Sequence, residues 1–208
     1  MIERLLVFGA GGHAKVVAEA AQLAGYDVVG FIDARPEIQH TSILGIPVIG
    51  DESVLKSPDW ANCVMVVAIG DNALRASIVE RLASLGRRFA VVRHPASTIS
   101  PSATLGEGTV VLAGVVINSM ATIGRHCIVN TMASIDHDCS LADFVHISPG
   151  SHLAGHCRIG EMAHIGIGAC MLPNLSVGHR STIGGGAVVT TDIPGDAIAV
   201  GVPAKVVQ

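Results

Sequence analysis

Five consecutive hexapeptides occupy residues 111–140: VLAGVV, INSMAT, IGRHCI, VNTMAS and IDHDCS. Each begins with an aliphatic residue, and the same phase runs from Ile99 to Val189 through sixteen repeats. The fifth position of the repeat holds mostly small or modest side chains, such as Ala103, Thr109, Val115, Ala121, Cys127, Ala133, Cys139, Ser151, Cys157, Ala163 and Ala169. A series of this length in one phase indicates a repeat architecture.

A period of six predicts a parallel β-helix, in which every repeat is one short strand followed by a turn. If three repeats close one triangular coil, residues eighteen apart stack on successive coils about 4.8 Å from each other, as paired strands do. The first position then points into the prism, and the fifth is small because it packs near a corner. This pattern resembles the left-handed β-helix of the hexapeptide acyltransferases, and the handedness is taken from that resemblance.

The composition agrees with such a core. Half of the 208 residues are apolar, and 24 are glycine. The net charge of −4 and the lack of a basic stripe argue against a nucleic-acid partner. No apolar run reaches the roughly 20 residues of a membrane span, and Met1–Arg4 leads into a strand without a signal peptide. We therefore expect a soluble, cytoplasmic protein that does not bind membranes.

The five cysteines do not indicate a disulfide or a metal site. Three of them, Cys127, Cys139 and Cys157, occupy the small fifth position, and no C-x-x-C pair is present. We interpret these three as core residues and predict no metal.

Residues 1–95 have a different pattern, which predicts a small Rossmann-like α/β domain ahead of an all-β domain at 96–208. The expected strands cover 5–8, 28–32, 63–69 and 90–92, and the expected helices cover 14–23 and 73–85. Strands that alternate with helices imply a parallel sheet. The first domain is expected to bind a nucleotide-linked sugar, and the second to carry the chemistry.

Gly9-x-Gly11-x-x-Ala14 follows the first strand with the spacing of a dinucleotide fingerprint, and Asp33 comes about twenty residues later. Glycines let the backbone approach a ligand closely, and a helix amino terminus attracts phosphate. A plain tight turn is the alternative. A nicotinamide enzyme is disfavoured, because 1–95 can hold only half of a full dinucleotide fold. The predicted nucleotide-binding residues are Gly11, Gly12, His13, Asp33 and Gly70.

Four motifs are spread over essentially the whole chain: Phe8-Gly9-Ala10-Gly11-Gly12-His13, Ala68-Ile69-Gly70-Asp71-Asn72, His137-Asp138-Cys139 and Val200-Gly201-Val202-Pro203-Ala204-Lys205. Together they resemble the bacterial sugar acyltransferases of the PglD and NeuD type. The resemblance implies an enzyme that uses acetyl-CoA to acetylate amino groups, sometimes hydroxyls, of nucleotide-linked or sialic-acid-type sugars. Ala34, directly after Asp33, is also among the residues expected to bind the substrate.

His137 stands two residues after Ile135, at a corner position where a side chain points outward. A histidine beside a carboxylate can take a proton from a nucleophile, while the carboxylate fixes its tautomer and raises its basicity. A surface histidine in a polar turn is the alternative, but the pair matches the catalytic position of the resembling family. That family usually has Glu where Asp138 stands, so either Asp138 or Asp136 could orient the imidazole.

Gly155 lies eighteen residues after His137, on the same corner one coil along, where its N–H could face a thioester oxygen. Ile167 and Gly185 are also eighteen apart but belong to another corner. The resemblance implies that these residues and His146 contact acetyl-CoA. A site that uses two corners suggests two subunits, and we expect a homotrimer with active sites between chains.

The resulting prediction is an acetyl-CoA-dependent N-acetyltransferase of a UDP- or GDP-linked amino sugar, with no acyl-enzyme. An O-acetyltransferase of a sialic-acid-type sugar is the first alternative. A zinc hydratase of the γ-carbonic anhydrase type lacks a third histidine at the right spacing, and a non-catalytic scaffold leaves the His137-Asp138 pair unexplained. The remaining β-helix histidines are expected to be solvated or interfacial: His126, His152, His156, His164 and His179.

Overall fold

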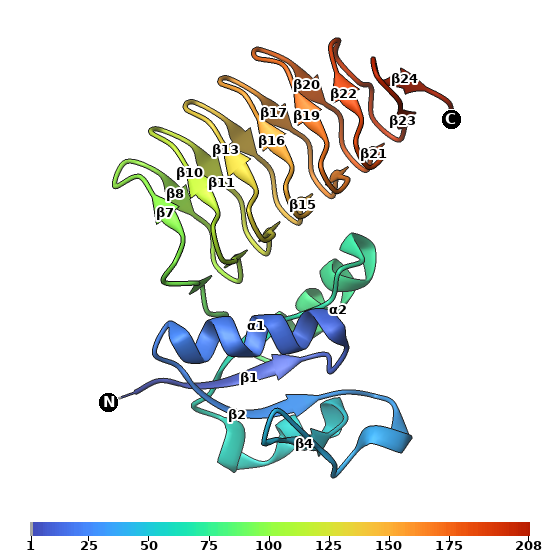
Figure 1. Cartoon of the computed structure of the whole chain (residues 1–208). Coiled ribbons are helices and arrows are strands. Elements are labelled where there is room, and N and C mark those ends of the chain that lie inside the picture. Colours follow the sequence, from blue (N-terminus) through green and yellow to red (C-terminus); the bar gives the residue numbers. More distant parts are fainter. Residues whose placement is uncertain (1) are drawn as a thin grey trace. The chain divides into compact units, whose positions relative to one another are not determined.

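The computed structural model describes residues 2–208, and its contacts divide the chain into two compact units, Met1–Pro95 and Ala96–Gln208. The first unit is a small α/β fold and the second is a long run of short parallel strands (Figure 1). The predicted fold class, a Rossmann-like domain followed by a left-handed parallel β-helix, is confirmed.

The first unit is built on one sheet in the order β3-β4-β2-β1-β5. Its strands pair in parallel except for β3, which is antiparallel to β4. The interior strand β1 is apolar and buried from its second residue onward, as expected of a strand covered on both faces. The strands of this sheet are β1 (Arg4–Phe8), β2 (Asp27–Ile32), β3 (Ser42–Ile43), β4 (Ile46–Gly50) and β5 (Val64–Val67); the short strand β6 (Val92–Arg93) is not part of it.

Two helices, α1 (Gly12–Leu23) and α2 (Asn72–Ser84), accompany this sheet. Helix α1 packs on β1 and β2 through small and branched side chains, namely Ala14, Val17, Ala18, Ala20 and Ala21. The carboxylate of Asp71 caps α2 by accepting a hydrogen bond from the N–H of Leu74 at 2.8 Å. Three short 3₁₀ helices complete the unit: η1 (Pro36–Ile38), η2 (Glu52–Lys56) and η3 (Pro58–Trp60).

Strands β3 and β4 were not expected from the sequence. The run Ile46–Gly50 contains Pro47, which disfavours a central strand and hides the signal of an otherwise apolar segment. The expected strand at 90–92 is also shorter in the structure: Phe89 forms a single bridge with Met65, and β6 begins at Val92.

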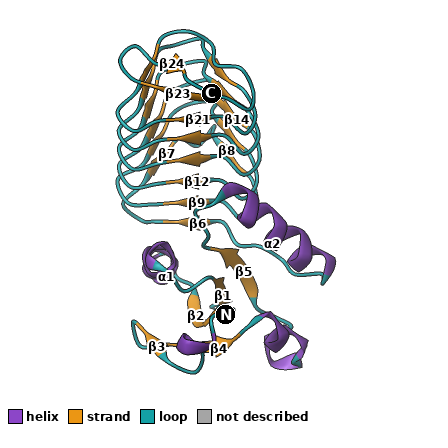
Figure 2. Ribbon diagram, turned by 90° about the vertical axis from the view of Figure 1, so that its right-hand side faces the viewer, coloured by secondary structure: helices purple, strands orange, loops and turns teal. Residues whose placement is uncertain are grey.

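The second unit stacks two-residue strands into three parallel sheets, which Figure 2 shows as successive rungs. Strands three repeats apart pair in register, so that Ile135 lies beside Ile117 and Leu153. The strands are β7 (Thr98–Ile99), β8 (Thr104–Leu105), β9 (Val110–Val111), β10 (Val116–Ile117), β11 (Thr122–Ile123), β12 (Ile128–Val129), β13 (Ser134–Ile135), β14 (Ser140–Leu141), β15 (His146–Ile147), β16 (His152–Leu153), β17 (Arg158–Ile159), β18 (His164–Ile165), β19 (Cys170–Met171), β20 (Ser176–Val177), β21 (Thr182–Ile183), β22 (Val188–Val189), β23 (Ile198–Val200) and β24 (Lys205–Val206).

The core of the β-helix has the predicted composition. The first position of the repeat is buried from Val111 to Val189, and the small fifth position is buried with it. Cys127, Cys139 and Cys157 are at most 1% exposed, so their interpretation as core residues is confirmed. The second residue of each corner from Gly108 to Gly186 has a positive φ, and glycine, which tolerates it best, occupies five of these positions: Gly108, Gly114, Gly150, Gly168 and Gly186.

The repeat ends after β22. The next pairings join Val177 to Ile193 and Ile183 to Ala199, so the last coil is two residues shorter than the earlier ones. Strand β24 then pairs antiparallel with β23 and covers the end of the prism. Within residues 2–208, no helix combines the length and the apolar character needed to cross a membrane.

Candidate active site

The His137–Asp138 pair lies at the corner where strand β13 ends. Ile135 is buried in the core, and the chain turns directly after it, which leaves the side chains of His137 and Asp138 53% and 42% exposed. Asp138 has a φ of 59°, a left-handed conformation that Asp accepts more readily than most residues. Its carboxylate lies next to the imidazole, with Oδ2 2.8 Å from Nδ1 of His137.

This contact gives the imidazole the properties of a base. The hydrogen bond to Asp138 raises the pKa of His137 above that of an ordinary histidine. When the ring is neutral, Nδ1–H donates to the carboxylate, and Nε2 keeps the lone pair that can accept a proton. The exposed position of the ring lets a substrate reach that nitrogen.

Asp136 contacts the backbone of this corner, not the imidazole. Its Oδ1 accepts hydrogen bonds from the backbone N–H of His137 at 2.7 Å and from Nδ2 of Asn118 at 2.9 Å. These bonds, that of the His137 N–H foremost, lower the pKa of Asp136. Asp136 therefore supports the backbone, and Asp138 is the carboxylate that contacts the imidazole.

Gly155 lies directly under the ring of His137. A Cβ atom added to Gly155 would be 2.6 Å from Cε1 and 2.7 Å from Nε2 of His137, closer than real contacts allow. The backbone ladder links the same two coils, because the N–H of His156 donates to the carbonyl of His137 at 3.0 Å. The lack of a side chain at Gly155 is therefore what lets the imidazole lie flat on the next coil.

Ile167 and Gly185 lie together on a different corner, after strands β18 and β21. Ile167 is 63% exposed. A Cβ atom at Gly185 would meet Cγ2 of Ile167 at 3.1 Å, so the glycine leaves room beside that side chain. This corner offers a small exposed apolar edge.

His146 points outward from β15 and is largely buried. Its ring stacks on that of His164 in the next coil, with centroids 4.8 Å apart and planes within 2°. Nδ2 of Asn130 lies 3.4 Å from Nε2 of His146, and Oγ of Ser148 lies 2.8 Å from Nε2 of His164. These contacts hold two imidazoles in a fixed column on one face.

His126 differs from the expectation of a solvated or interfacial side chain. It is only 4% exposed and stacks on Phe144, with ring centroids 5.3 Å apart. The prediction was wrong because an aromatic residue one coil along provides a packing surface that the repeat pattern alone does not reveal.

In the first unit, the predicted phosphate loop connects β1 to α1. Gly9 has a φ of 102°, and Gly11 is the N-cap of α1. Cβ atoms at Gly11 or Gly12 would meet no other atom within 4 Å, so both glycines border open space at the helix amino terminus. Burial, aided by the charge of Arg75, lowers the pKa of His13 to about 4, and His13 is therefore neutral at physiological pH.

Asp33, which directly follows β2, is hydrogen-bonded to this loop. Its Oδ2 accepts a hydrogen bond from the N–H of Ala10 at 2.9 Å, and Arg35 forms a two-pronged ion pair with both oxygens at 2.9 and 3.0 Å. The side chain of Arg35 contributes most to lowering the pKa of Asp33. Both carboxylate oxygens are thus engaged by the chain itself.

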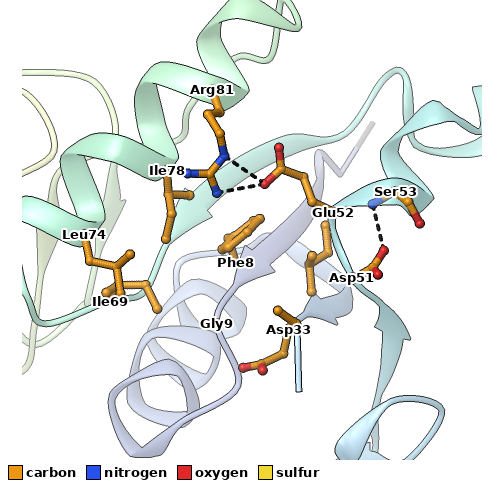
Figure 3. A pocket seen from close by; sticks show the side chains of 12 residues that line it. Phe8, Gly9, Asp33, Asp51, Glu52, Ser53, Ile69, Leu74, Ile78 and Arg81 are labelled. Carbon is orange, nitrogen blue, oxygen red and sulfur yellow. Dashed lines mark hydrogen bonds and ion pairs between the residues drawn. The ribbon is translucent and has the colours of Figure 1, made fainter. Parts of the chain in front are cut away.

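A cavity of about 510 Å³ opens at the carboxyl ends of β1, β2 and β4 (Figure 3). Of the residues predicted to bind substrate, Asp33 and Ala34 line it, whereas Gly11, Gly12, His13 and Gly70 do not. The ion pair between Arg81 and Glu52, 3.0 Å long, spans one side. The lining residues are Phe8, Gly9, Ile32, Asp33, Ala34, Asp51, Glu52, Ser53, Ile69, Leu74, Ile78 and Arg81.

Three polar residues that line this cavity were not expected from the sequence. Asp51, Glu52 and Ser53 follow β4, the strand that Pro47 concealed, and the Asp51 carboxylate accepts from the N–H of Ser53 at 2.9 Å. An apolar run that ends in Gly50-Asp51 is a signal for a strand and loop at this edge. No short motif indicated that Arg81 would line the cavity, because its partner Glu52 is 29 residues away in the chain.

The family model of the PglD N-terminal domain matches residues 4–82. The GDP-perosamine N-acetyltransferase of Escherichia coli O157:H7 is 29% identical over 156 residues, which are 72% of this chain and 69% of that protein. The acetyltransferase domain of PglB from Neisseria gonorrhoeae, solved with acetyl coenzyme A, is 45% identical, with a TM-score of 0.94 over 100% of both chains. PerB from Caulobacter crescentus, solved with CoA and GDP-perosamine, is 40% identical, with a TM-score of 0.94 over 100% of this chain and 99% of that one.

Proposed function

The chain belongs to the PglD- and NeuD-type family of bacterial sugar acyltransferases, and from this premise we propose that it transfers the acetyl group of acetyl-CoA to the amino group of a nucleotide-linked sugar, with His137 as general base. The relatives are named N-acetyltransferases, which disfavours the alternative of sialic acid O-acetylation. The proposal leaves uridine and guanosine diphosphate as the two candidate carriers.

One observation carries this assignment: Nδ1 of His137 is 2.8 Å from the Asp138 carboxylate, in an exposed corner that leaves Nε2 open. Attack by a sugar amine on the thioester carbonyl forms the new C–N bond and gives a tetrahedral oxyanion. Nε2 of His137 takes the proton that the nitrogen loses, and collapse of the oxyanion breaks the C–S bond. The leaving thiolate then accepts a proton, so no acyl-enzyme is needed.

The residues expected to contact acetyl-CoA fit that molecule chemically. The exposed side chain of Ile167 beside Gly185 suits an apolar pantetheine arm. We assign the thioester to the corner of His137 and Gly155, where the Gly155 N–H serves as an oxyanion donor, and place His146 near it.

We assign the nucleotide to the first unit. The open amino terminus of α1 at Gly11 and Gly12 offers backbone donors to phosphate oxygens, and Gly70 follows a neighbouring strand. The cavity beside Asp33 and Ala34 is large enough for a base. Because the Asp33 carboxylate is already paired with Arg35, a ribose or base that binds Asp33 must share it with that guanidinium.

The assembly we propose is a homotrimer. The residues assigned to acetyl-CoA lie on two different corners of the prism, and a cyclic trimer brings different corners of neighbouring chains together. All five cysteines are free thiols, which supports a reducing compartment, and we place the enzyme in the cytoplasm.

A panel of nucleotide amino sugars, offered with acetyl-CoA and followed by release of free thiol, tests the proposal. We expect turnover with a UDP- or GDP-linked amino sugar. The matching nucleoside diphosphate alone should compete with the sugar acceptor while leaving the apparent affinity for acetyl-CoA nearly unchanged, because we assign the two ligands to different units. O-acetylation of free sialic acid, without binding of either diphosphate at millimolar concentration, would refute the assignment.

A further inference from the structure

A third side chain, His156, meets the His137–Asp138 pair. Asp138 and His156 occupy the same corner position on successive coils, and both have positive φ, 59° and 61°. Nε2 of His156 lies 3.6 Å from Oδ2 of Asp138, the oxygen that also contacts His137. The two imidazole rings meet edge to face, with centroids 5.2 Å apart.

These three side chains offer a donor set for a metal ion. One ligand atom from each of His137, Asp138 and His156 can be chosen so that all lie within 4.8 Å of one another. Around a tetrahedral zinc ion with bonds near 2.1 Å, ligand atoms stand about 3.4 Å apart. The contacts of Asp138 Oδ2, at 2.8 Å to His137 and 3.6 Å to His156, lie on either side of that value. Two imidazoles and one carboxylate are a ligand set that zinc accepts, with water at the fourth position.

We propose that His137, Asp138 and His156 form a binding site for a divalent metal ion of the zinc type, and that metal bound there reversibly blocks acetyl transfer. The metal takes the lone pair of Nδ1 of His137, so the single proton of the neutral ring must reside on Nε2. Nε2 is then a donor and can no longer accept the proton of the attacking amine. If the ring is protonated beforehand, one proton passes to the solvent on binding.

Other histidines of the β-helix lack this arrangement. His179 lies 3.2 Å from Asp196, but both oxygens of Asp196 accept from the guanidinium of Arg180, whose charge opposes a cation. His146 and His164 stack face to face, and Nε2 of His164 lies 2.8 Å from the hydroxyl of Ser148. Among the described residues 2–208, His137, Asp138 and His156 are the one group of three or more His, Cys, Asp or Glu side chains whose ligand atoms lie close enough together to hold a metal ion.

The inhibitory part of this inference rests on the proposed role of His137 as base, whereas metal binding does not. Binding is therefore measured directly, by calorimetric titration of the chelator-treated full chain with zinc chloride. We expect one zinc ion per chain with micromolar affinity. The same zinc concentrations should stop acetyl transfer, assayed by product formation, and EDTA should restore it.

His156→Asn is the test variant, because Asn accepts a positive φ and keeps a polar side chain of moderate size. Loss of one of three ligands should weaken zinc binding by more than about tenfold. The zinc concentration needed to inhibit acetyl transfer should rise by the same factor. The matched control is His179→Asn, which removes an exposed histidine beside a carboxylate and should bind zinc as the wild type does. Wild-type zinc affinity in His156→Asn, or weakened affinity in His179→Asn, would overturn the site.

Cobalt(II) provides a readout on the unmodified protein. We expect the visible absorption of a four-coordinate nitrogen and oxygen site, displaced by one equivalent of zinc. Absence of that absorption, together with no heat of zinc binding at micromolar concentration, would refute the proposal even if His156→Asn does not fold. If zinc binds as expected but no nucleotide amino sugar is acetylated, the metal site stands and the proposed function fails.

Discussion

Two corners of the β-helix have the same construction but different chemistry. At each of them a histidine ring covers a glycine of the next coil: His137 lies over Gly155, and His179 lies over Gly195, where an added Cβ would be 2.6 Å from the ring. Each histidine also has an aspartate beside it, Asp138 and Asp196. The two corners differ in what else contacts that aspartate.

At the His137 corner the carboxylate follows the histidine in the chain, and no guanidinium contacts it among the ion pairs of residues 2–208. At the His179 corner an arginine follows the histidine, and Arg180 contacts Asp196 at 2.6 and 2.8 Å. The charge of Asp196 is therefore largely neutralised by Arg180. The comparison indicates that a base at such a corner needs a carboxylate of its own, in addition to the histidine and the glycine.

The largest expected effect separates the two histidines. His137→Ala should lower kcat by roughly 10² to 10⁴, the usual contribution of a general base, while His179→Ala should change kcat little. Both side chains are about half exposed, so the stability of either variant should change by no more than about 0.5 kcal/mol. Steady-state kinetics and thermal unfolding of both variants measure this. Near-normal turnover of folded His137→Ala would remove the mechanism.

The next effect tests the glycine under each ring. Gly155→Ala places a methyl group where the His137 ring lies and should turn the imidazole out of position, with a loss in kcat of about 10²-fold. Gly195→Ala displaces the His179 ring in the same way and should leave kcat unchanged. Equal losses in the two variants would show that the methyl group disturbs the β-helix as a whole, not the position of the base.

The smallest effect tests the carboxylate. Asp138→Asn should lower kcat about tenfold, because Asn tolerates the positive φ but cannot supply the charge. Since Asp138 raises the pKa of His137, the variant should have a lower pKa at that residue. Activity requires neutral His137, so the rise of kcat/KM with pH should move to lower pH. An unchanged profile, like that expected for Asp196→Asn, would show that Asp138 does not tune the base.

The hexapeptide repeat explains why the position of His137 could be predicted from the sequence. Because Ile135 occupies the buried first position, His137 had to lie at a corner, and its stacking on Gly155 follows from the spacing of eighteen. The role of Asp138 could not be separated from that of Asp136, because both flank the histidine. In the structure the two residues differ. Asp138 has a positive φ, whereas the Asp136 carboxylate accepts a hydrogen bond from the backbone N–H of His137.

Contacts that depend on side-chain direction across coils were not predictable. His156 is about half exposed, as expected of a solvated side chain, but its sequence position did not show that its Nε2 lies 3.6 Å from Asp138 on the preceding coil. In the first unit, Glu52 and Arg81 meet across the cavity from segments that no short motif connects. Local periodicity determines which residues face outward, but it does not determine which outward side chains meet.

The pKa of His137 itself tests the central claim most directly. Histidine-labelled full chain, kept in EDTA, can be titrated by NMR, with the His137 resonance assigned from its loss in a His137→Gln variant. We expect His137 to titrate above the ordinary value near 6.5, and the acid limb of kcat/KM to follow the same pKa, because that limb reports the free enzyme. A His137 that titrates at or below that value, or a kinetic limb that does not coincide with its titration, would contradict the assignment of His137 as the base.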